Sequence, residues 1–313
     1  LIEGARTNSC IQSSDQTNAA WVKTSCTAAK DAVGLDGVAN SASTLTATGA
    51  NGTSLQTITI ASAAFTYTVW LKRKTGTGNI DITDNNGTNW TTVTGLSSAV
   101  FTPYSITRTQ ANPIVGIRVV TSGDEVEVDG CQLENGGYRT SVIATTTVAV
   151  TRALDSVIIS NLSWFNQGAA GTLYSHAETI LGSDFTGGVV SINDTTASNR
   201  IEITVVSKDD QYININTGGS EVAAWTQTNS INVNVYASGA AVKTASAFTT
   251  NDARPAVNGV LGSPPDTNLT IASTMTELRI GNDAINRRFY GFVKEIRYYN
   301  TRKPDSFLIE ETI

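Results

Sequence analysis

Apolar and polar residues alternate along much of this chain, which is the pattern of β-strands that bury one face and expose the other. Residues 65–72 show it most clearly, because their odd-numbered positions are apolar while Trp70 lies on the opposite face, outward or in a contact. The same reasoning predicts strands at residues 55–60, 79–83, 171–180, 189–193, 200–206, 211–216, 222–227, 229–236, 277–280 and 289–299, and one that begins at Trp90.

Short turns separate these segments. Asp84–Gly87, Gly218–Gly219 and Asn258–Gly259 have the Asn, Asp and Gly composition of tight turns. Amphipathic helices are not predicted between them, but Pro304 and Asp305 can begin a short C-terminal helix, because proline suits the first turn and a carboxylate suits the positive end of the helix dipole. The sequence therefore predicts an all-β protein of antiparallel jelly-roll sandwiches with a short C-terminal helix.

Residues 126–155 mark a division of the chain. Val126 and Val128 alternate with acidic residues as in a strand, Gly136–Gly137 ends that pattern, and an extended connector rich in Thr and Val runs to residue 153. A chain of 313 residues also exceeds the usual size of one hydrophobic core. We predict two tandem β-sandwich domains, residues 1–145 and residues 146–313.

Residues 114–130 have the pattern of a β-hairpin with its turn at residues 121–124. In that register Arg118 faces Glu127, so apolar residues share one side and charges the other. A tryptophan beside such charges suits a sugar, because the ring covers C–H groups while polar neighbours bind hydroxyls. The alternative, which we favour, is an ordinary ion pair beside an aromatic residue at a subunit contact. The candidate ligand-binding residues are Trp70, Trp90, Arg118, Glu127 and Asp129.

Composition narrows the range of functions. The formal net charge of −6 argues against a nucleic-acid binder, which needs clustered Lys and Arg. No stretch approaches the roughly 18 uninterrupted apolar residues of a membrane span, so we expect no membrane insertion. The three cysteines lack metal-ligand spacing. Cys131 is expected to be free and buried, while Cys10 and Cys26 are either bridged or, the favoured interpretation, reduced.

The sequence does not predict an enzyme. His176 is the only histidine, and no serine or cysteine lies in a nucleophile-elbow context, which favours a structural or surface role for it. Glycosidases need two carboxylates across a cleft. Asp209 and Asp210 do not fit that requirement, because adjacent side chains in a strand or turn point apart. A glycan-degrading spike fragment is therefore the least favoured alternative.

No cofactor is predicted, and structural calcium is the one alternative left open. Asp81, Asp84 and Asn86 could supply oxygen ligands to such an ion. Their spacing lacks the full pattern of a calcium-binding loop, so a plain Asx-rich turn is the favoured interpretation.

Several segments resemble bacteriophage virion fibre and tail proteins. LIEGARTN at the start, NAAWVK, TYTVWLKR and GCQLENGGYRTSVI look like the first module of such proteins, a sandwich similar to carbohydrate-binding modules. SWFNQGAAGTLY, KTASAFTTNDARPAVNG, MTELRIGN and FYGFVKEIRYYNTRKPDS are similar to the concanavalin-like or laminin-G-like module that follows it. The pieces occur in the same serial order and cover nearly the whole chain.

The resemblance implies a virion component on the particle surface that assembles as a homotrimer with other virion proteins and binds host-surface glycans. The function expected on this basis is non-enzymatic adhesion. The alternative is a purely structural decoration or adaptor protein whose aromatic residues fill subunit interfaces and bind no sugar. No residue-level ligand set is carried over from the family.

Overall fold

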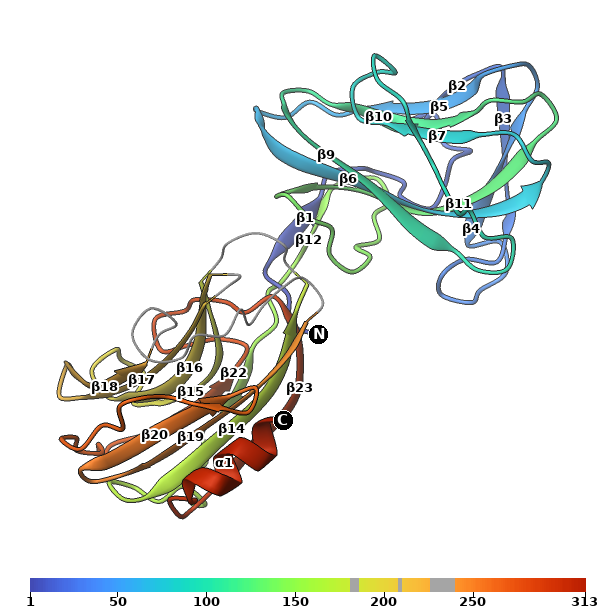
Figure 1. The fold of residues 1–313 in the computed structure, drawn as a ribbon. Coiled ribbons are helices and arrows are strands. Elements are labelled where there is room, and N and C mark those ends of the chain that lie inside the picture. Colours follow the sequence, from blue (N-terminus) through green and yellow to red (C-terminus); the bar gives the residue numbers. More distant parts are fainter. Residues whose placement is uncertain (181–185, 208–209, 226–239) are drawn as a thin grey trace. The chain divides into compact units, whose positions relative to one another are not determined.

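The structure is a computed structural model that describes residues 1–180, 186–207, 210–225 and 240–313. The chain forms two compact units (Figure 1). The N-terminal unit is Ala5–Ala153, and the C-terminal unit is Leu154–Ile313 together with Leu1–Gly4. The sequence had placed the division between residues 145 and 146. The described residues are nearly all β, with antiparallel sheets and one short helix at the end of the chain, so the predicted fold class is confirmed.

Two sheets make the sandwich of the N-terminal unit (Figure 1). The strand order of the first is β2 (Val22–Thr24), β5 (Gly52–Thr57), β10 (Ile114–Val119), β7 (Ile80–Thr83) and β8 (Thr91–Thr92). That of the second is β3 (Cys26–Ala32), β4 (Ala42–Ala47), β11 (Glu125–Asn135), β6 (Ala63–Thr75) and β9 (Thr102–Gln110). A separate two-stranded ribbon pairs β1 (Arg6–Asn8) with β12 (Val150–Arg152).

The predicted hairpin at residues 114–130 is wrong. β10 pairs with β5 and β7 in the first sheet, whereas β11 pairs with β4 and β6 in the second. The turn at residues 121–124 carries the chain across from one sheet to the other. Ile117 and Val126 are both fully buried in the same core, which they reach from opposite sheets. Alternation alone does not distinguish a hairpin from such a crossing, because both give one buried face per strand.

The core of the N-terminal unit contains all three cysteines. Cys10, Cys26 and Cys131 are buried free thiols, so the bridge between Cys10 and Cys26 is not formed and the prediction for Cys131 is confirmed. The Cys131 sulfur lies 3.9 Å from the Tyr67 hydroxyl and 3.3 Å from Nε2 of Gln16. Burial raises the pKa of the Cys131 thiol to about 12, which keeps it protonated and unreactive.

The C-terminal unit is a second sandwich. One sheet has the order β13 (Val157–Ile159), β22 (Glu277–Ile280), β15 (Gly187–Asn193), β16 (Arg200–Ser207), β17 (Asp210–Thr217) and β18 (Ser220–Trp225). The other has the order β21 (Val260–Leu261), β20 (Asp252–Val257), β19 (Ala241–Thr249), β14 (Gly171–Thr179) and β23 (Gly291–Tyr299). The predicted strand at residues 229–236 and Asp209 lie outside the described residues.

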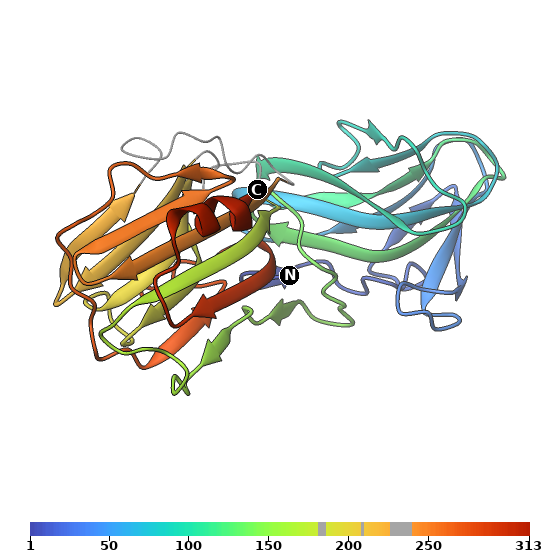
Figure 2. The same cartoon turned by 60° about the horizontal axis from the view of Figure 1, so that its bottom comes forward.

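The predicted C-terminal helix is α1 (Asp305–Thr312), with Pro304 as its N-cap residue and Asp305 in its first turn. Figure 2 shows that it lies on the outer face of the sheet containing β14 and β19. Leu308 is fully buried there with Tyr174 and Ala245. In the described part of the chain no helix has the length and apolar character needed to cross a membrane.

Candidate functional site

Trp164 is an exposed aromatic residue in the loop between β13 and β14. About 40% of its surface is open to solvent, whereas Leu162 and Phe165 on either side are buried in the core. The backbone N–H of Ser163 donates a hydrogen bond to Oδ1 of Asn161 at 3.1 Å, which shapes the start of the loop. Because its neighbours are anchored, the indole of Trp164 is held at the surface.

Tyr298, near the end of β23, forms an aromatic cluster with Trp164 and Phe165. Its ring centroid lies 5.3 Å from that of Trp164 and 5.2 Å from that of Phe165. The Tyr298 hydroxyl accepts a hydrogen bond from the backbone N–H of Asn166 at 3.3 Å. Burial raises the pKa of the Tyr298 phenol, so the hydroxyl keeps its proton and can donate a hydrogen bond to a ligand.

The cluster opens into a pocket of about 510 Å³ lined by Trp164, Tyr298, Tyr299 and Asn300. This volume falls within the range of about 300–1,000 Å³ found for small-molecule sites. None of the lining side chains is charged, and Asn300 is exposed with an amide that both donates and accepts hydrogen bonds. Aromatic faces beside neutral hydrogen-bonding groups suit a neutral sugar, whose C–H groups pack on rings while its hydroxyls bind polar atoms.

In the N-terminal unit, the structure brings together Trp90 and Arg118 from the predicted ligand-binding set. The Arg118 guanidinium lies 4.4 Å from the centre of the Trp90 ring. Arg118 also donates from Nε at 2.8 Å and from Nη2 at 2.6 Å to Oδ2 of Asp81, which is 1% exposed. Asp81 therefore neutralises Arg118, and a ligand-binding role for Trp90 and Arg118 stays a prediction.

The other three predicted residues lie on the second sheet of that unit, so the five do not form one surface. Of the two orientations predicted for Trp70, the structure shows the contact and not the outward-facing one, because the side chain is 7% exposed. It lies against Gly130, where an added Cβ would be 2.9 Å from the indole and 3.3 Å from Leu35. Asp129 accepts a hydrogen bond from the backbone N–H of Leu35 at 2.8 Å, and this bond ties the covering loop in place. Glu127 forms an ion pair with Lys72.

The two aspartates considered for calcium, Asp81 and Asp84, bind arginines. Asp81 accepts the two hydrogen bonds from Arg118, and Asp84 accepts one from Nε of Arg108 at 3.0 Å. Asn86 has a φ of 58° within the turn, as the Asx-rich turn interpretation expects. Among the described residues, no group of three or more His, Cys, Asp or Glu side chains could hold a metal ion.

His176 lies in β14, opposite Lys243 on β19 and Glu295 on β23. Partial burial lowers the pKa of its imidazole, and the charges of Lys294 and Lys243 lower it further. The histidine is therefore part of a charged sheet surface.

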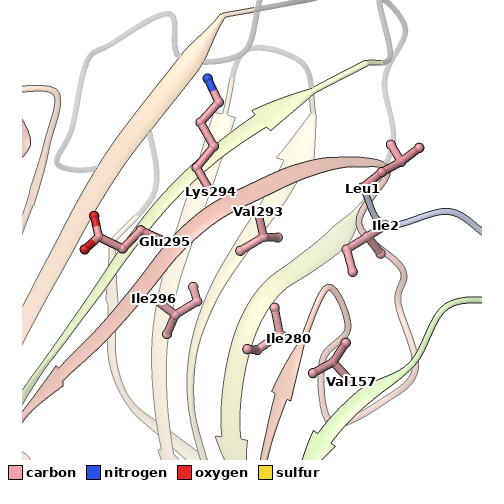
Figure 3. Close-up of a pocket in the computed structure, with 8 residues that line it drawn as sticks. All are labelled: Leu1, Ile2, Val157, Ile280, Val293, Lys294, Glu295 and Ile296. Carbon is pink, nitrogen blue, oxygen red and sulfur yellow. The ribbon is translucent and has the colours of Figure 1, made fainter.

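A second concavity of the C-terminal unit, of about 340 Å³, lies between β23 and the edge of the facing sheet. Figure 3 shows apolar side chains converging on it, while the charged ends of Lys294 and Glu295 point away. At one end Ile2 exchanges two backbone hydrogen bonds with Gly291, of 2.7 and 3.1 Å. The apolar lining comprises Leu1, Ile2, Val157, Ile280, Val293 and Ile296, which offers no polar side chain to a sugar.

Comparison with known proteins gives partial similarities only. No family model matches the sequence, and no curated protein matches it. Among similar solved structures is the NanB sialidase from Streptococcus pneumoniae, with 14% identity, a TM-score of 0.42 and coverage of 50% of this chain but 26% of the sialidase. The chain therefore spans about a quarter of that enzyme.

Two further solved structures are similar over about half of this chain. The CBM40 of the Ruminococcus gnavus IT-sialidase, bound to alpha2,3 sialyllactose, has 12% identity and a TM-score of 0.40 over 47% of this chain and 84% of its own. A heptameric SAP-like pentraxin from Limulus polyphemus has 11% identity and a TM-score of 0.35 over 46% and 72%.

The sequence reasoning missed Trp164 as a binding residue. A signal was present, because Ser163–Gln167 places two aromatic residues side by side between polar residues that favour a loop. Adjacent residues in such a loop do not both point into one core, so one of the pair is expected at the surface. The partner Tyr298 is 134 residues away in sequence and could not be paired with Trp164 from spacing.

Proposed function

We propose that this protein is a non-enzymatic glycan-binding protein and that its pocket around Trp164 takes a neutral sugar. The observation that carries the proposal is an indole 40% exposed, yet fixed by buried neighbours, at the wall of a pocket lined by aromatic and amide groups. Sugar-binding sites need such a rigid aromatic face, because a ring that is already ordered loses little entropy on binding.

The test is a glycan array of neutral host-surface sugars, followed by calorimetry on the best ligand. Trp164→Ala is expected to weaken binding by about 30-fold, or about 2 kcal/mol, which is typical of a central aromatic contact. Phe292→Ala is the matched control, because Phe292 is also 40% exposed in the same unit but does not line the pocket. No binding to any sugar, or equal losses in both variants, would contradict the proposal.

We further propose that the sugar-binding activity serves adhesion from a virion surface, where the protein would act as a homotrimer beside other virion proteins. The resemblance of the ordered sequence segments to phage fibre and tail proteins supports this part of the proposal. Light scattering on the intact chain tests the oligomer, and a stable monomer would count against it.

A second candidate function is structural decoration without sugar binding. The observation that favours it is β13, an edge strand in which Val157, Ile158 and Ile159 are 42%, 50% and 40% exposed. Consecutive exposed apolar residues on a sheet edge are typical of protein contacts. Loss of self-association in Ile158→Asp, together with an empty glycan array, would favour this function over the first.

A further inference from the structure

A third pocket lies in the N-terminal unit beside the β1–β12 ribbon and has a volume of about 390 Å³. Its chemistry differs from that of the Trp164 pocket, because one of its lining residues is an arginine and none is acidic. The lining residues are Ala5, Arg6, Thr7, Asn135, Gly136 and Thr151.

Arg6 carries a charge that no described residue neutralises. It forms no ion pair, and its Nε is buried without a hydrogen-bond partner in the described part of the chain. Its guanidinium lies 4.8 Å from the centre of the Tyr138 ring, which holds it in place. Arg73, Arg108 and Arg118 are different, since each of these arginines in the same unit forms an ion pair with an aspartate.

The ribbon places a second positive charge directly opposite the first. Arg6 and Arg152 are Cα partners in the register of β1 and β12. Like charges in directly opposite positions destabilise an antiparallel pair. A ligand of negative charge in the pocket would give Arg6 the acidic partner that it lacks among the described residues.

The backbone next to the guanidinium is also specialised. Gly136 has a φ of 126°, and a Cβ on it would lie 2.9 Å from Nη2 of Arg6. The positive φ favours glycine at this position, and a Cβ there would displace the end of the Arg6 side chain. The neighbouring Asn135 is exposed, and the hydroxyls of Thr7 and Thr151 lie 2.7 Å apart in a mutual hydrogen bond. Amide and hydroxyl groups thus line the same pocket as the cation.

We propose that this pocket binds the oxyanion of a small polar molecule, a carboxylate or a phosphate ester on a monosaccharide-sized ligand. Arginine suits both groups, because its planar fork of N–H donors matches two oxygens of one oxyanion. The volume admits one sugar unit with its acidic substituent. The site is independent of the proposed function, since it uses other residues in the other unit and selects for charge.

The experiment is calorimetry of the full chain with D-glucuronate, D-glucose 6-phosphate and D-glucose as probes. One or both anions are expected to bind and glucose is expected not to bind at this pocket. Arg6→Gln is expected to weaken anion binding at least about tenfold, the loss of one charged hydrogen-bonding contact. Raising the salt from about 50 to about 500 mM is expected to weaken it as well.

Lys30→Gln is the matched control. It removes one positive charge from the same unit, where Lys30 is 3.9 Å from Asp15 and 37% exposed, without touching the pocket. Its anion affinity is expected to equal that of the parent protein. Arg6→Lys, which keeps the charge but loses the planar fork, is expected to bind with intermediate affinity.

A direct measurement covers the case in which Arg6→Gln is destabilised. In the parent protein the nuclear magnetic resonance signal of the Arg6 Nε–H group is expected to shift as either anion is added. An unmoved signal, equal affinity in Arg6→Gln, or absence of binding by both anions would overturn the proposal. Neutral-sugar binding sensitive to Trp164→Ala would survive any of these outcomes, so the two proposals fail separately.

Discussion

Arg118 provides the sharpest test of how the N-terminal unit is built. The sequence pairs it with Glu127 across a hairpin, whereas the structure pairs it with Asp81 on β7 and places Glu127 in the other sheet. A double-mutant cycle measures which carboxylate Arg118 contacts, because the coupling energy vanishes for residues without a shared partner. The variants are Arg118→Ala, Asp81→Ala, Glu127→Ala and the two double variants.

The magnitude follows from burial. Asp81 is 1% exposed, so Arg118→Ala leaves a largely buried carboxylate without its charged partner. Removal of one partner from a buried pair costs about 3–5 kcal/mol. We expect about 3 kcal/mol, at the low end, because the Arg118 side chain is 26% exposed and already partly hydrated. The Arg118–Asp81 coupling energy is expected to be about 2 kcal/mol, and the Arg118–Glu127 coupling energy less than about 0.5 kcal/mol.

The assay is urea unfolding, in which the transition of the N-terminal unit is fitted separately because a chain of two units need not unfold in one step. Trp21 and Trp70 report on this transition, because both are buried in the N-terminal unit. A coupling energy above about 1 kcal/mol with Glu127, or one below about 0.5 kcal/mol with Asp81, would refute the assignment of β10 and β11 to different sheets.

Three further predictions concern other parts of the chain. The pKa of His176 is lowered in the native state, so the unfolded state binds a proton on this histidine more readily, and the free energy of unfolding is expected to fall as the pH drops from 7 through the ordinary pKa of 6.5. The fall is expected to be smaller in His176→Gln, and identical urea midpoints for the two proteins across this pH range would contradict the prediction. Burial raises the pKa of Cys26 to about 11 and that of Cys131 to about 12, so iodoacetamide at pH 8 is expected to label no cysteine of the native protein and all three after denaturation. Mass spectrometry counts the labels, and rapid labelling of the native protein would contradict the burial of the thiols. Gly116→Ala would place a Cβ 2.1 Å from the carbonyl oxygen of Ser54 and is expected to lower the free energy of unfolding in urea by about 3 kcal/mol, whereas the Cβ of Gly37→Ala, a position with a left-handed φ, would meet no neighbouring atom. An unchanged urea midpoint for Gly116→Ala would contradict this packing.

Most strands were predictable from the sequence because alternation is a local property. Residues 277–280 and 171–180 match β22 and β14 closely. The start of the C-terminal helix at Pro304–Asp305 was predictable for the same reason, because it also depends on residues that are neighbours in sequence. Among the strands that were missed are β3, β4, β9, β19 and β20. In the last two the reason is that Ala241–Thr249 is rich in small residues and that Pro255 interrupts the pattern of the next strand.

For the candidate site, the sequence predicted the type of side chains but not which residues form it. An aromatic residue beside hydrogen-bonding groups was expected, but around Trp70, which a loop bearing Leu35 covers. Loop cover depends on tertiary contacts that strand periodicity does not contain, and the same holds for the meeting of Trp164 with Tyr298.

The sequence by itself determined the all-β class, the turns and the terminal helix, because these depend on neighbours a few residues apart. Only the tertiary structure decided which sheet each strand joins, which tryptophan stays exposed, and that Arg6 has no acidic partner among the described residues. The physical reason is that a side chain's exposure and charge balance are set by residues far away in sequence, and one buried face per strand is compatible with many pairings.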